Sequence, residues 1–288
     1  MSRRAGLLSA AAMAAFAANS LLCRAALGSG RVDATTFTSL RLVSGALVLA
    51  VLAARGGKGG HGSWASAAAL FGYALAFSLA YLRIPAAAGA LLLFGAVQAT
   101  MIGWALVCGE RPPPLEWLGL ATALAGLLVL TRPGLAAPDP LGSGLMAAAG
   151  VCWGVYSLRG RGSGDPLGAN AAHFARAAPL ALFASLAALA LGAPRLSLAG
   201  AVLAVASGAL ASGLGYALWF AALRDLTATQ AAIVQLTVPP LAALGAVLFL
   251  GETLSLRLAL AGALILGGVA LVAAAGLKPR PPATPTSS

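Results

Sequence analysis

The stretch Gln230–Leu271 is QAAIVQLTVPPLAALGAVLFLGETLSLRLALAGALILGGVAL, and it decides the fold of the chain. It consists of two long apolar runs joined by a short turn at Gly251-Glu252. A run of about 20 apolar residues matches the thickness of the hydrocarbon core of a bilayer. Both runs are therefore predicted to be membrane-spanning helices.

Two adjacent prolines, Pro239 and Pro240, interrupt the first of these runs. Proline lacks the N–H that would bond the carbonyl four residues earlier, so the carbonyls of Gln235 and Leu236 are freed at membrane depth. Unpaired backbone is tolerated there only where it is packed in protein or lines a water-filled cavity. The break thus predicts either a solute site beside Gln235 or a kink packed against neighbouring helices.

Composition extends the membrane prediction to the whole chain of 288 residues, of which 60% are hydrophobic and only 9% are charged. A soluble domain has about 25% charged residues, so we expect an integral membrane protein. The formal net charge of +11 comes from basic residues that stand singly between apolar runs. Because no basic patch with interleaved aromatic residues appears, the expected partner is a lipid bilayer and not a nucleic acid.

Ten apolar runs are predicted to span the membrane, and the short connections between them leave no room for a soluble domain. Their limits are 5–27, 34–54, 64–82, 85–107, 115–131, 141–158, 168–191, 197–221, 228–250 and 256–276. Residues 277–288 are polar and proline-rich, and we expect them to form a disordered cytoplasmic tail.

The distribution of Lys and Arg predicts the orientation of the chain. With the N-terminus inside, ten of these residues fall on the inner side of the spans and six on the outer side. Positive charge gathers on the cytoplasmic side, so both termini are predicted to be cytoplasmic. The high content of Ala, Gly and Arg favours a bacterial source and hence the inner membrane.

An internal repeat divides the chain into two halves. The Gly-Glu pair at 109–110 recurs 142 residues later at 251–252, and the same offset places Gly126 on Gly268. Earlier in each half, Arg41 matches Arg176, 135 residues later. Five spans per half is an odd number, so the halves must insert with opposite topology. The predicted fold is all-α, with ten transmembrane helices in two inverted five-helix repeats, 5–131 and 141–276, around a central cavity.

Several motifs carry a resemblance to a known family. They are GVCWGVYSLRG at Gly150–Gly160, Pro239, the Gly251-Glu252 pair and LALAGALILGGVAL at residues 258–271. On these motifs the chain resembles an EamA-type member of the drug/metabolite transporter superfamily. The resemblance implies ten spans arranged as two EamA repeats, and the export of amino acids or similar metabolites, as in the bacterial amino-acid and metabolite exporters.

The seven acidic residues all lie in connections or at helix ends. A proton-coupled antiporter usually needs an ionisable group within the membrane, so their placement favours a facilitator or exchanger. Glu252 is either a counter-charge at the mouth of the pathway or a solvated loop charge. His173 is either a packing residue or a proton relay.

No catalytic or metal-binding constellation is predicted. His61 and His173 lie far apart, no acid accompanies them in the membrane, and the three cysteines lack CxxC spacing. We therefore expect a protein that is not an enzyme and that holds neither a metal nor a cofactor.

Two arginines, Arg41 and Arg176, fall inside predicted spans. A charge at this depth is costly and usually finds water, lipid headgroups or protein partners. These two side chains either attract a carboxylate-bearing solute or extend to the nearer headgroups.

Polar and aromatic side chains within spans are the candidates for a substrate site. Uncharged amides such as Asn19 bind both ammonium and carboxylate groups, but they also join helices by hydrogen bonds. The aromatic residues of span three share one helical face, and they either line a cavity or belong to the aromatic belts at the interfaces. The predicted cavity-lining set is Asn19, Ser20, Tyr73, Phe77, Gln98, Trp153, Tyr156, Tyr216, Trp219, Gln235 and Pro239.

The function predicted from these features is transport of a small organic metabolite by alternating access, as a monomer or homodimer. An amino-acid exporter for aromatic or neutral substrates fits the deep aromatic faces and neutral amides best. The alternatives are an exporter of multiple drugs or cationic compounds, which would need a buried carboxylate, and a carrier of another metabolite.

Overall fold

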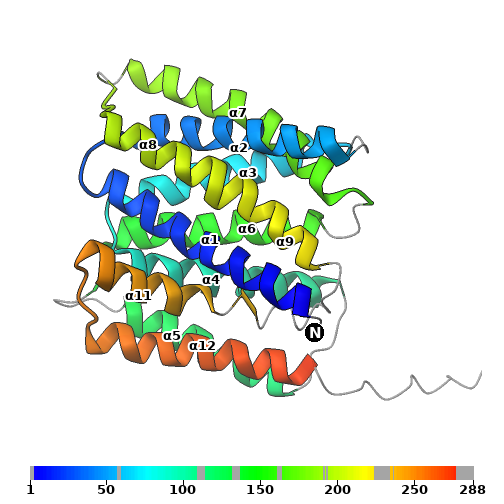
Figure 1. The fold of residues 1–288 in the computed structure, drawn as a ribbon. Helices are drawn as coiled ribbons and strands as arrows, with labels where there is room; N and C mark the ends of the chain where they lie inside the picture. Colours follow the sequence, from blue (N-terminus) through cyan, green and yellow to red (C-terminus); the bar gives the residue numbers. More distant parts are fainter. Residues whose placement is uncertain are drawn as a thin grey trace, which may run out of the picture.

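The computed structural model describes residues 3–56, 60–108, 114–131, 137–160, 164–190, 192, 194–223, 234–235 and 237–276. These residues are almost entirely helical, and the helices run side by side across the view of Figure 1. Within the described ranges the one strand-like pairing is an isolated bridge between Val32 and Leu196. The predicted tail at 277–288 lies outside the described residues.

The helices follow the predicted spans closely. The described elements are α1 (Arg3–Leu27), α2 (Ala34–Gly56), α3 (Trp64–Tyr81), α4 (Ala86–Val107), α5 (Pro114–Thr131), α6 (Pro140–Gly160), α7 (Pro166–Leu189), α8 (Leu198–Ala206), η1 (Ser207–Leu214), α9 (Gly215–Leu223), α11 (Val238–Leu250) and α12 (Leu256–Gly276). The eighth predicted span corresponds to α8, η1 and α9 in succession. Most of the first ten residues of the ninth predicted span lie outside the described residues.

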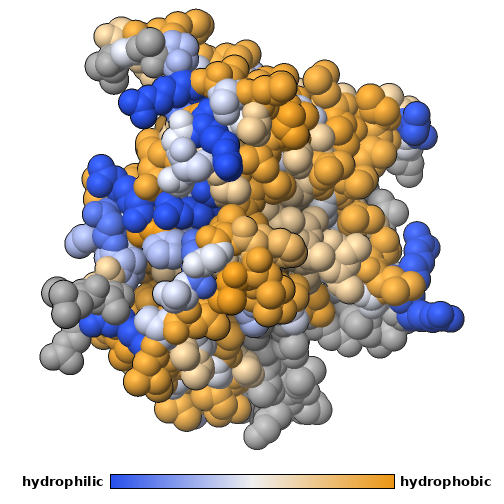
Figure 2. All heavy atoms as spheres, turned by 60° about the vertical axis from the view of Figure 1, so that its left-hand side comes forward, coloured by the Kyte–Doolittle hydropathy of each residue, from blue (hydrophilic) through white to orange (hydrophobic). Residues whose placement is uncertain are grey.

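Length and composition make this an all-α, multi-pass membrane protein. Six described segments are long and apolar enough to cross a membrane, namely α1, α2, α3, α6, α7 and the continuous run Leu198–Ala222. Four shorter apolar helical segments lie in α4, α5, α11 and α12. Large apolar side chains such as Leu47, Phe183 and Phe249 point outward. Figure 2 shows apolar residues over much of the visible face, with hydrophilic residues gathered toward its edges.

Helix packing brings elements from the two halves of the chain together. Helix α2 packs on α7 at the top of Figure 1, and α5 packs on α12 at the bottom. Between these pairs, α6 packs against α3 and α4, whereas α1 packs against α8, η1, α9 and α11. The centre of the protein is therefore built from both halves.

The segment η1 is a π-helix in the middle of the eighth span. Its hydrogen bonds join residues five apart, so Ser207 and Ser212 lie one turn from each other on the same side. Glycine allows this segment to approach α2 closely, because a Cβ on Gly208 would lie 2.2 Å from the carbonyl oxygen of Arg41. The close approach places the π-helix directly against the helix that carries Arg41.

The two prolines of the ninth span begin a helix. Helix α11 starts at Val238, so Pro239 and Pro240 occupy its first turn, where an N–H has no intrahelical acceptor to lose. The helix ends at Gly251, whose φ of +66° gives the left-handed conformation that terminates many helices. The prolines therefore lie at the start of α11, which begins three residues after the half-buried Gln235.

Candidate functional site

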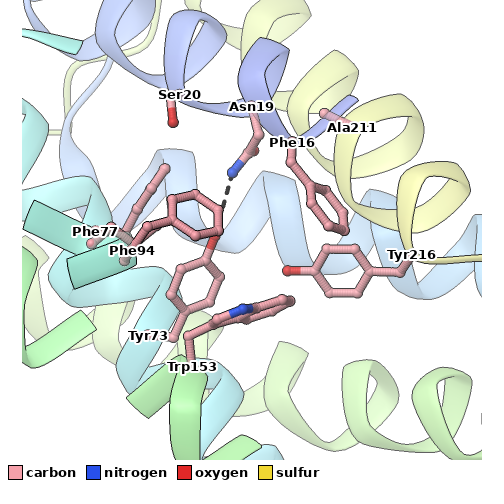
Figure 3. Close-up of a pocket in the computed structure, with 10 residues that line it drawn as sticks. Phe16, Asn19, Ser20, Tyr73, Phe77, Phe94, Trp153, Ala211 and Tyr216 are labelled. Carbon is pink, nitrogen blue, oxygen red and sulfur yellow. Dashed lines mark hydrogen bonds between the residues drawn. The ribbon is translucent and has the colours of Figure 1, made fainter. Parts of the chain in front are cut away.

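A small cavity lies at the centre of the protein, among α1, α3, α4, α6, η1 and α9 (Figure 3). Its free volume is about 20 Å³, which is room for about one water molecule. The lining residues are Phe16, Asn19, Ser20, Tyr73, Phe77, Leu93, Phe94, Trp153, Ala211 and Tyr216. Six of the eleven residues predicted from the sequence meet here: Asn19, Ser20, Tyr73, Phe77, Trp153 and Tyr216.

Aromatic rings form most of the cavity wall. The centroid of the Trp153 ring lies 4.9 Å from that of Tyr73 and 5.1 Å from that of Tyr216. Phe77 continues the wall beside Tyr73 at 5.3 Å, and Phe16 lies 5.6 Å from Tyr216. Aromatic pairs at these separations attract one another. The wall is therefore a connected set of rings from α1, α3, α6 and α9.

Asn19 holds its amide in a fixed orientation at the cavity. The hydroxyl of Ser207 in the π-helix donates to Asn19 Oδ1 at 2.6 Å. On its other side, Asn19 Nδ2 donates to the Tyr73 hydroxyl at 3.4 Å, the dashed line in Figure 3. Asn19 is 5% exposed, so these two contacts link α1 to η1 and α3 within the buried core.

Tyr216 presents a buried hydroxyl group that makes no hydrogen bond of normal geometry within the described part of the chain. Its side chain is 3% exposed. In Figure 3 this hydroxyl points into the space between Asn19, Tyr73 and Trp153. A buried hydroxyl without a hydrogen bond costs free energy, so the cavity offers a polar group that a bound solute can use.

Arg41 lies directly behind the aromatic wall and is 1% exposed. Its Nη2 donates to the Tyr73 hydroxyl and its Nε to Ser212 Oγ, both at 3.0 Å. The guanidinium carbon lies 5.1 Å from the ring centroid of Tyr73 and 5.2 Å from that of Phe77. The third nitrogen, Nη1, has no hydrogen-bond partner among the described residues. Arg41 therefore does not extend to the headgroups but points into the protein.

Its repeat-related counterpart, Arg176 of α7, lies in a different environment. The side chain is half-buried, and its Nη1 donates to the carbonyl oxygen of Ala172 in its own helix at 3.0 Å. Its guanidinium carbon lies 5.9 Å from the ring centroid of Trp64, a residue that is 62% exposed at the start of α3. Arg176 is thus less buried than Arg41 and is bonded within its own helix.

The carboxylates whose side chains the structure describes all bond to the start of a helix. Asp33, Asp139 and Asp165 accept from backbone N–H groups in the first turns of α2, α6 and α7. Burial raises the pKa of Asp33, but hydrogen bonds from Thr36, Thr35 and Arg195 outweigh it and hold this pKa below its usual value. None of these carboxylates lines the cavity. Glu110 and Asp225, and the side chain of Glu116, lie outside the described residues.

Glu252 joins several helices at one end of the protein. Its Oε1 accepts from the backbone N–H of Ala86, the first residue of α4, at 2.8 Å. The same oxygen lies 3.7 Å from Nε of Arg24, whose Nη1 donates to the carbonyl oxygen of Tyr81 at 2.8 Å. Glu252 is thus paired with Arg24 at the end of α1 and is not a solvated loop charge.

A second polar cluster lies behind Trp153. The hydroxyl of Tyr156 donates to Asn170 Oδ1 and lies 3.3 Å from His173 Nδ1. The ring of Tyr156 lies 5.7 Å from that of Trp153, centroid to centroid. His173 is buried within this cluster. Tyr156 therefore supports the wall of the cavity without lining it.

The remaining predicted residues lie outside the cavity wall. Trp219 is buried and its ring centroid lies 6.1 Å from that of Phe16, so it backs the wall. Gln98 is buried in α4, Gln235 is half-buried before α11, and Pro239 is buried in the first turn of α11. None of the four is among the lining residues of the described cavity.

Sequence reasoning missed four lining residues. They are Phe16, Leu93, Phe94 and Ala211. Phe16 precedes Asn19 by three positions and Ser20 by four, so helical spacing alone places it on the same face of α1. Among the described residues no group of three or more His, Cys, Asp or Glu is placed to hold a metal ion.

Comparisons with known proteins agree with this architecture. Residues 140–274 match the model of the EamA-like transporter family. An uncharacterized protein of Pseudomonas aeruginosa, PA1977, is 54% identical over 276 residues, which are 94% of this chain and 95% of that protein. The threonine/homoserine exporter RhtA of Escherichia coli is 29% identical over 162 residues, 56% of this chain and 55% of the exporter.

A solved structure supports the fold independently. A protein of known crystal structure superposes with a TM-score of 0.63 over 91% of this chain and 98% of that chain, at 24% sequence identity. Identity at this level bears on the fold alone, whereas the sequence matches bear on the family. The chain belongs to the EamA-like transporter family of the drug/metabolite transporter superfamily.

Proposed function

We propose that this protein exports small organic metabolites, with amino acids of aromatic or neutral character as the first candidates, through the central cavity. The observation that carries the proposal is the cavity itself, where the buried Tyr73, Trp153 and Tyr216 and the half-buried Phe16 form an aromatic wall with polar groups set into it. Pockets of this kind, apolar with a few placed polar groups, are typical of small-molecule sites. The partial match to a threonine/homoserine exporter supports an amino-acid substrate.

The packing of the helices supports two inverted repeats with alternating access. The first helix of the second half, α6, packs against α3 and α4 of the first half. In the same way, the first helix of the first half, α1, packs against the eighth span and α11 of the second half. Repeat-related Gly126 and Gly268 each lie against the other's helix: a Cβ on Gly126 would be 2.9 Å from the Ala261 carbonyl oxygen, and one on Gly268 would be 2.4 Å from that of Gly119. Inverted repeats that meet at a central site are a recurrent basis for alternating access.

The small volume of the cavity fits a contracted state of such a cycle. About 20 Å³ of free space takes no amino acid, so the substrate enters when the rings of the wall separate. The contact between Glu252, Arg24 and the start of α4 closes one end of the helix bundle beside the wall. Rocking of α3 and α4 against the eighth span and α11 would open the cavity to either side in turn.

Facilitated or exchange transport is the mode of coupling that we propose. The described carboxylates lie at helix ends, away from the cavity, and His173 is bonded to Tyr156 behind Trp153. Cationic drugs are the weaker alternative, because a buried arginine and not a carboxylate lies next to the wall. We also propose insertion in the bacterial inner membrane with both termini in the cytoplasm.

The test is uptake of labelled aromatic and small polar amino acids into proteoliposomes, with and without a pH gradient. We expect saturable uptake that is independent of the gradient and that falls at least about tenfold in Trp153→Ala, since loss of a buried aromatic wall removes about 1.5–3 kcal/mol of contact. Trp64→Ala is the matched control, because this tryptophan is exposed and does not line the cavity. Uptake that requires the gradient would contradict the proposed coupling, and equal loss in both variants would contradict the proposed site.

A further inference from the structure

We propose that Arg41 and Tyr216 form an anion-binding subsite at the cavity, which takes the carboxylate group of the transported solute. This inference rests on the proposed transport function and makes it more specific. It assigns a substrate class, namely amino acids and other small carboxylic acids with an uncharged side chain. It also assigns the residues that distinguish such a solute from an amine or an amide of the same shape.

The first argument is charge. A buried ionised group is stable only when it is paired or coordinated, and Arg41 is 1% exposed at the centre of a membrane protein. The ion pairs between described side chains are Arg24 with Glu252 and Arg83 with Asp139, and neither involves Arg41. Its present partners are two hydroxyl groups and two ring faces, all of them neutral. A carboxylate from the solute supplies the charge that these partners lack.

The second argument is the pair of free hydrogen-bond donors. Nη1 of Arg41 and the hydroxyl of Tyr216 are both buried, and neither makes a hydrogen bond of normal geometry to a described residue. Tyr216 lines the cavity with its hydroxyl pointing into the space beside Tyr73 (Figure 3), and Arg41 lies behind the wall with Nη2 on the Tyr73 hydroxyl. A carboxylate has two oxygens and accepts from two donors at once, with guanidinium as the best-matched donor in geometry. The two orphaned groups are therefore complementary to one ligand group.

The third argument is the fixed position of the guanidinium. Ser212 of the π-helix holds Nε, the Tyr73 hydroxyl holds Nη2, and the rings of Tyr73 and Phe77 cover the guanidinium plane. Three of these four contacts come from Tyr73 and Phe77, which line the cavity. An arginine held in this way loses little conformational freedom on binding a ligand. The remainder of an amino acid then lies against the aromatic wall formed by Tyr73, Trp153 and Tyr216.

The test is thermal unfolding of the purified full chain in detergent with matched ligands. The probes are L-phenylalanine, L-threonine, L-valine and phenylacetate, each compared with its own amide at the same ionic strength. A ligand that binds the folded protein raises its unfolding temperature by an amount that grows with the logarithm of the ligand concentration relative to its Kd. We expect at least one acid to stabilise the wild type while its amide does not.

Variants assign the effect to the two residues. In Arg41→Gln the acid concentration needed for the same shift as in the wild type should rise at least about 100-fold, because truncating one partner of a buried, hydrogen-bonded charge pair removes most of its contribution to binding. In Tyr216→Phe, which removes only the unpartnered hydroxyl, it should rise about tenfold, as for one hydrogen bond to a charged group. Arg41→Lys should bind with intermediate affinity, because it keeps the charge and loses the planar fork. Arg176→Gln is the control and should respond like the wild type.

Several outcomes would overturn the proposal. One is equal stabilisation by acids and amides, or by none of them. A second is an unchanged acid response in Tyr216→Phe together with a much lower unfolding temperature of Arg41→Gln without ligand, which would assign Arg41 a structural role. Uptake of amino acids together with equal stabilisation by each acid and its amide would leave the proposed transport intact and reject this subsite. Conversely, an acid response without amino-acid uptake would support the subsite and count against the proposed substrates.

Discussion

Helices α2 and α7 pack against each other and carry two arginines that lie 135 residues apart in the sequence, yet the environments of these arginines differ. Arg41 of α2 is 1% exposed and bonds to Ser212 and Tyr73 from other helices. Arg176 of α7 is half-buried and bonds to a carbonyl group of its own helix. The two arginines that align in the sequence therefore lie in different environments, one in the core behind the cavity wall and one in a more exposed position.

The neighbours of the two helices explain the difference. Helix α2 lies against the π-helix η1, where Gly208 lets the backbones meet and Ser212 offers a hydroxyl group to the guanidinium. Helix α7 packs against α3, and Arg176 of α7 lies beside Trp64, the exposed first residue of α3. The environment, and not the arginine itself, therefore decides which charge stays in the core.

The largest effect that we expect separates the two arginines by charge inversion. Arg41→Glu places a carboxylate without a cationic partner in the core, which should lower the free energy of unfolding by about 3–5 kcal/mol. Arg176→Glu should lower it by less than about 1 kcal/mol, because Arg176 is only half-buried and makes no ion pair with a described side chain. Chemical denaturation of both variants in detergent measures the difference. Equal losses would mean that the two positions are equivalent after all.

A smaller effect concerns the close approach that brings the π-helix to Arg41. In Gly208→Ala the new Cβ would lie 2.0 Å from Ser44 Oγ and 2.2 Å from the Arg41 carbonyl oxygen. Such overpacking costs about 1–3 kcal/mol, and it should also weaken the acid response by moving Ser212 away from Arg41. The control is Gly144→Ala in α6, where nothing lies within 4 Å of the new Cβ and where alanine favours the helix by up to about 1 kcal/mol. Chemical denaturation of both variants, with and without the carboxylic-acid ligands, measures the effect of this contact on stability and on ligand binding. A Gly208→Ala protein as stable as the Gly144→Ala control would contradict the prediction.

Much of the fold could be predicted from the sequence because long apolar runs have one stable form in a bilayer. The limits of α2, α3, α4 and α5 agree with the predicted spans to within two residues. The π-helix at Ser207–Leu214 was not predicted, since the sequence SGALASGL contains no signal that separates it from an α-helix. Its winding depends on packing against α2, which is a property of the assembled protein.

The site was harder to predict because lipid and protein core are both apolar. A soluble helix shows its inner face by the contrast between apolar and polar residues, and that contrast is weak in these spans. Aromatic spacing correctly grouped Tyr73 with Phe77 on the cavity side. The amides of Gln98 and Gln235 carried no such information about direction, and they lie outside the wall. For Arg41 the sequence left two interpretations, and only the neighbouring Ser212 and Tyr73 decide between them.

The smallest effect concerns the cap of α2, the helix that carries Arg41. Asp33 accepts from the backbone N–H of Thr36 and has a pKa below its usual value. Its contribution to stability is therefore fully present above the pKa of this aspartate in the unfolded chain. The contribution is lost as the pH falls through the lower pKa of the folded protein. Asp33→Asn should lower the free energy of unfolding by at most about 1 kcal/mol near neutral pH, since asparagine also caps helices. It should also flatten the decline in stability below about pH 4, the ordinary range of an aspartate. Unfolding measured across this pH range tests both points, with Asp165→Asn at the start of α7 as the matched variant. An unchanged decline of stability at low pH in Asp33→Asn would show that the cap of α2 does not contribute to the pH dependence.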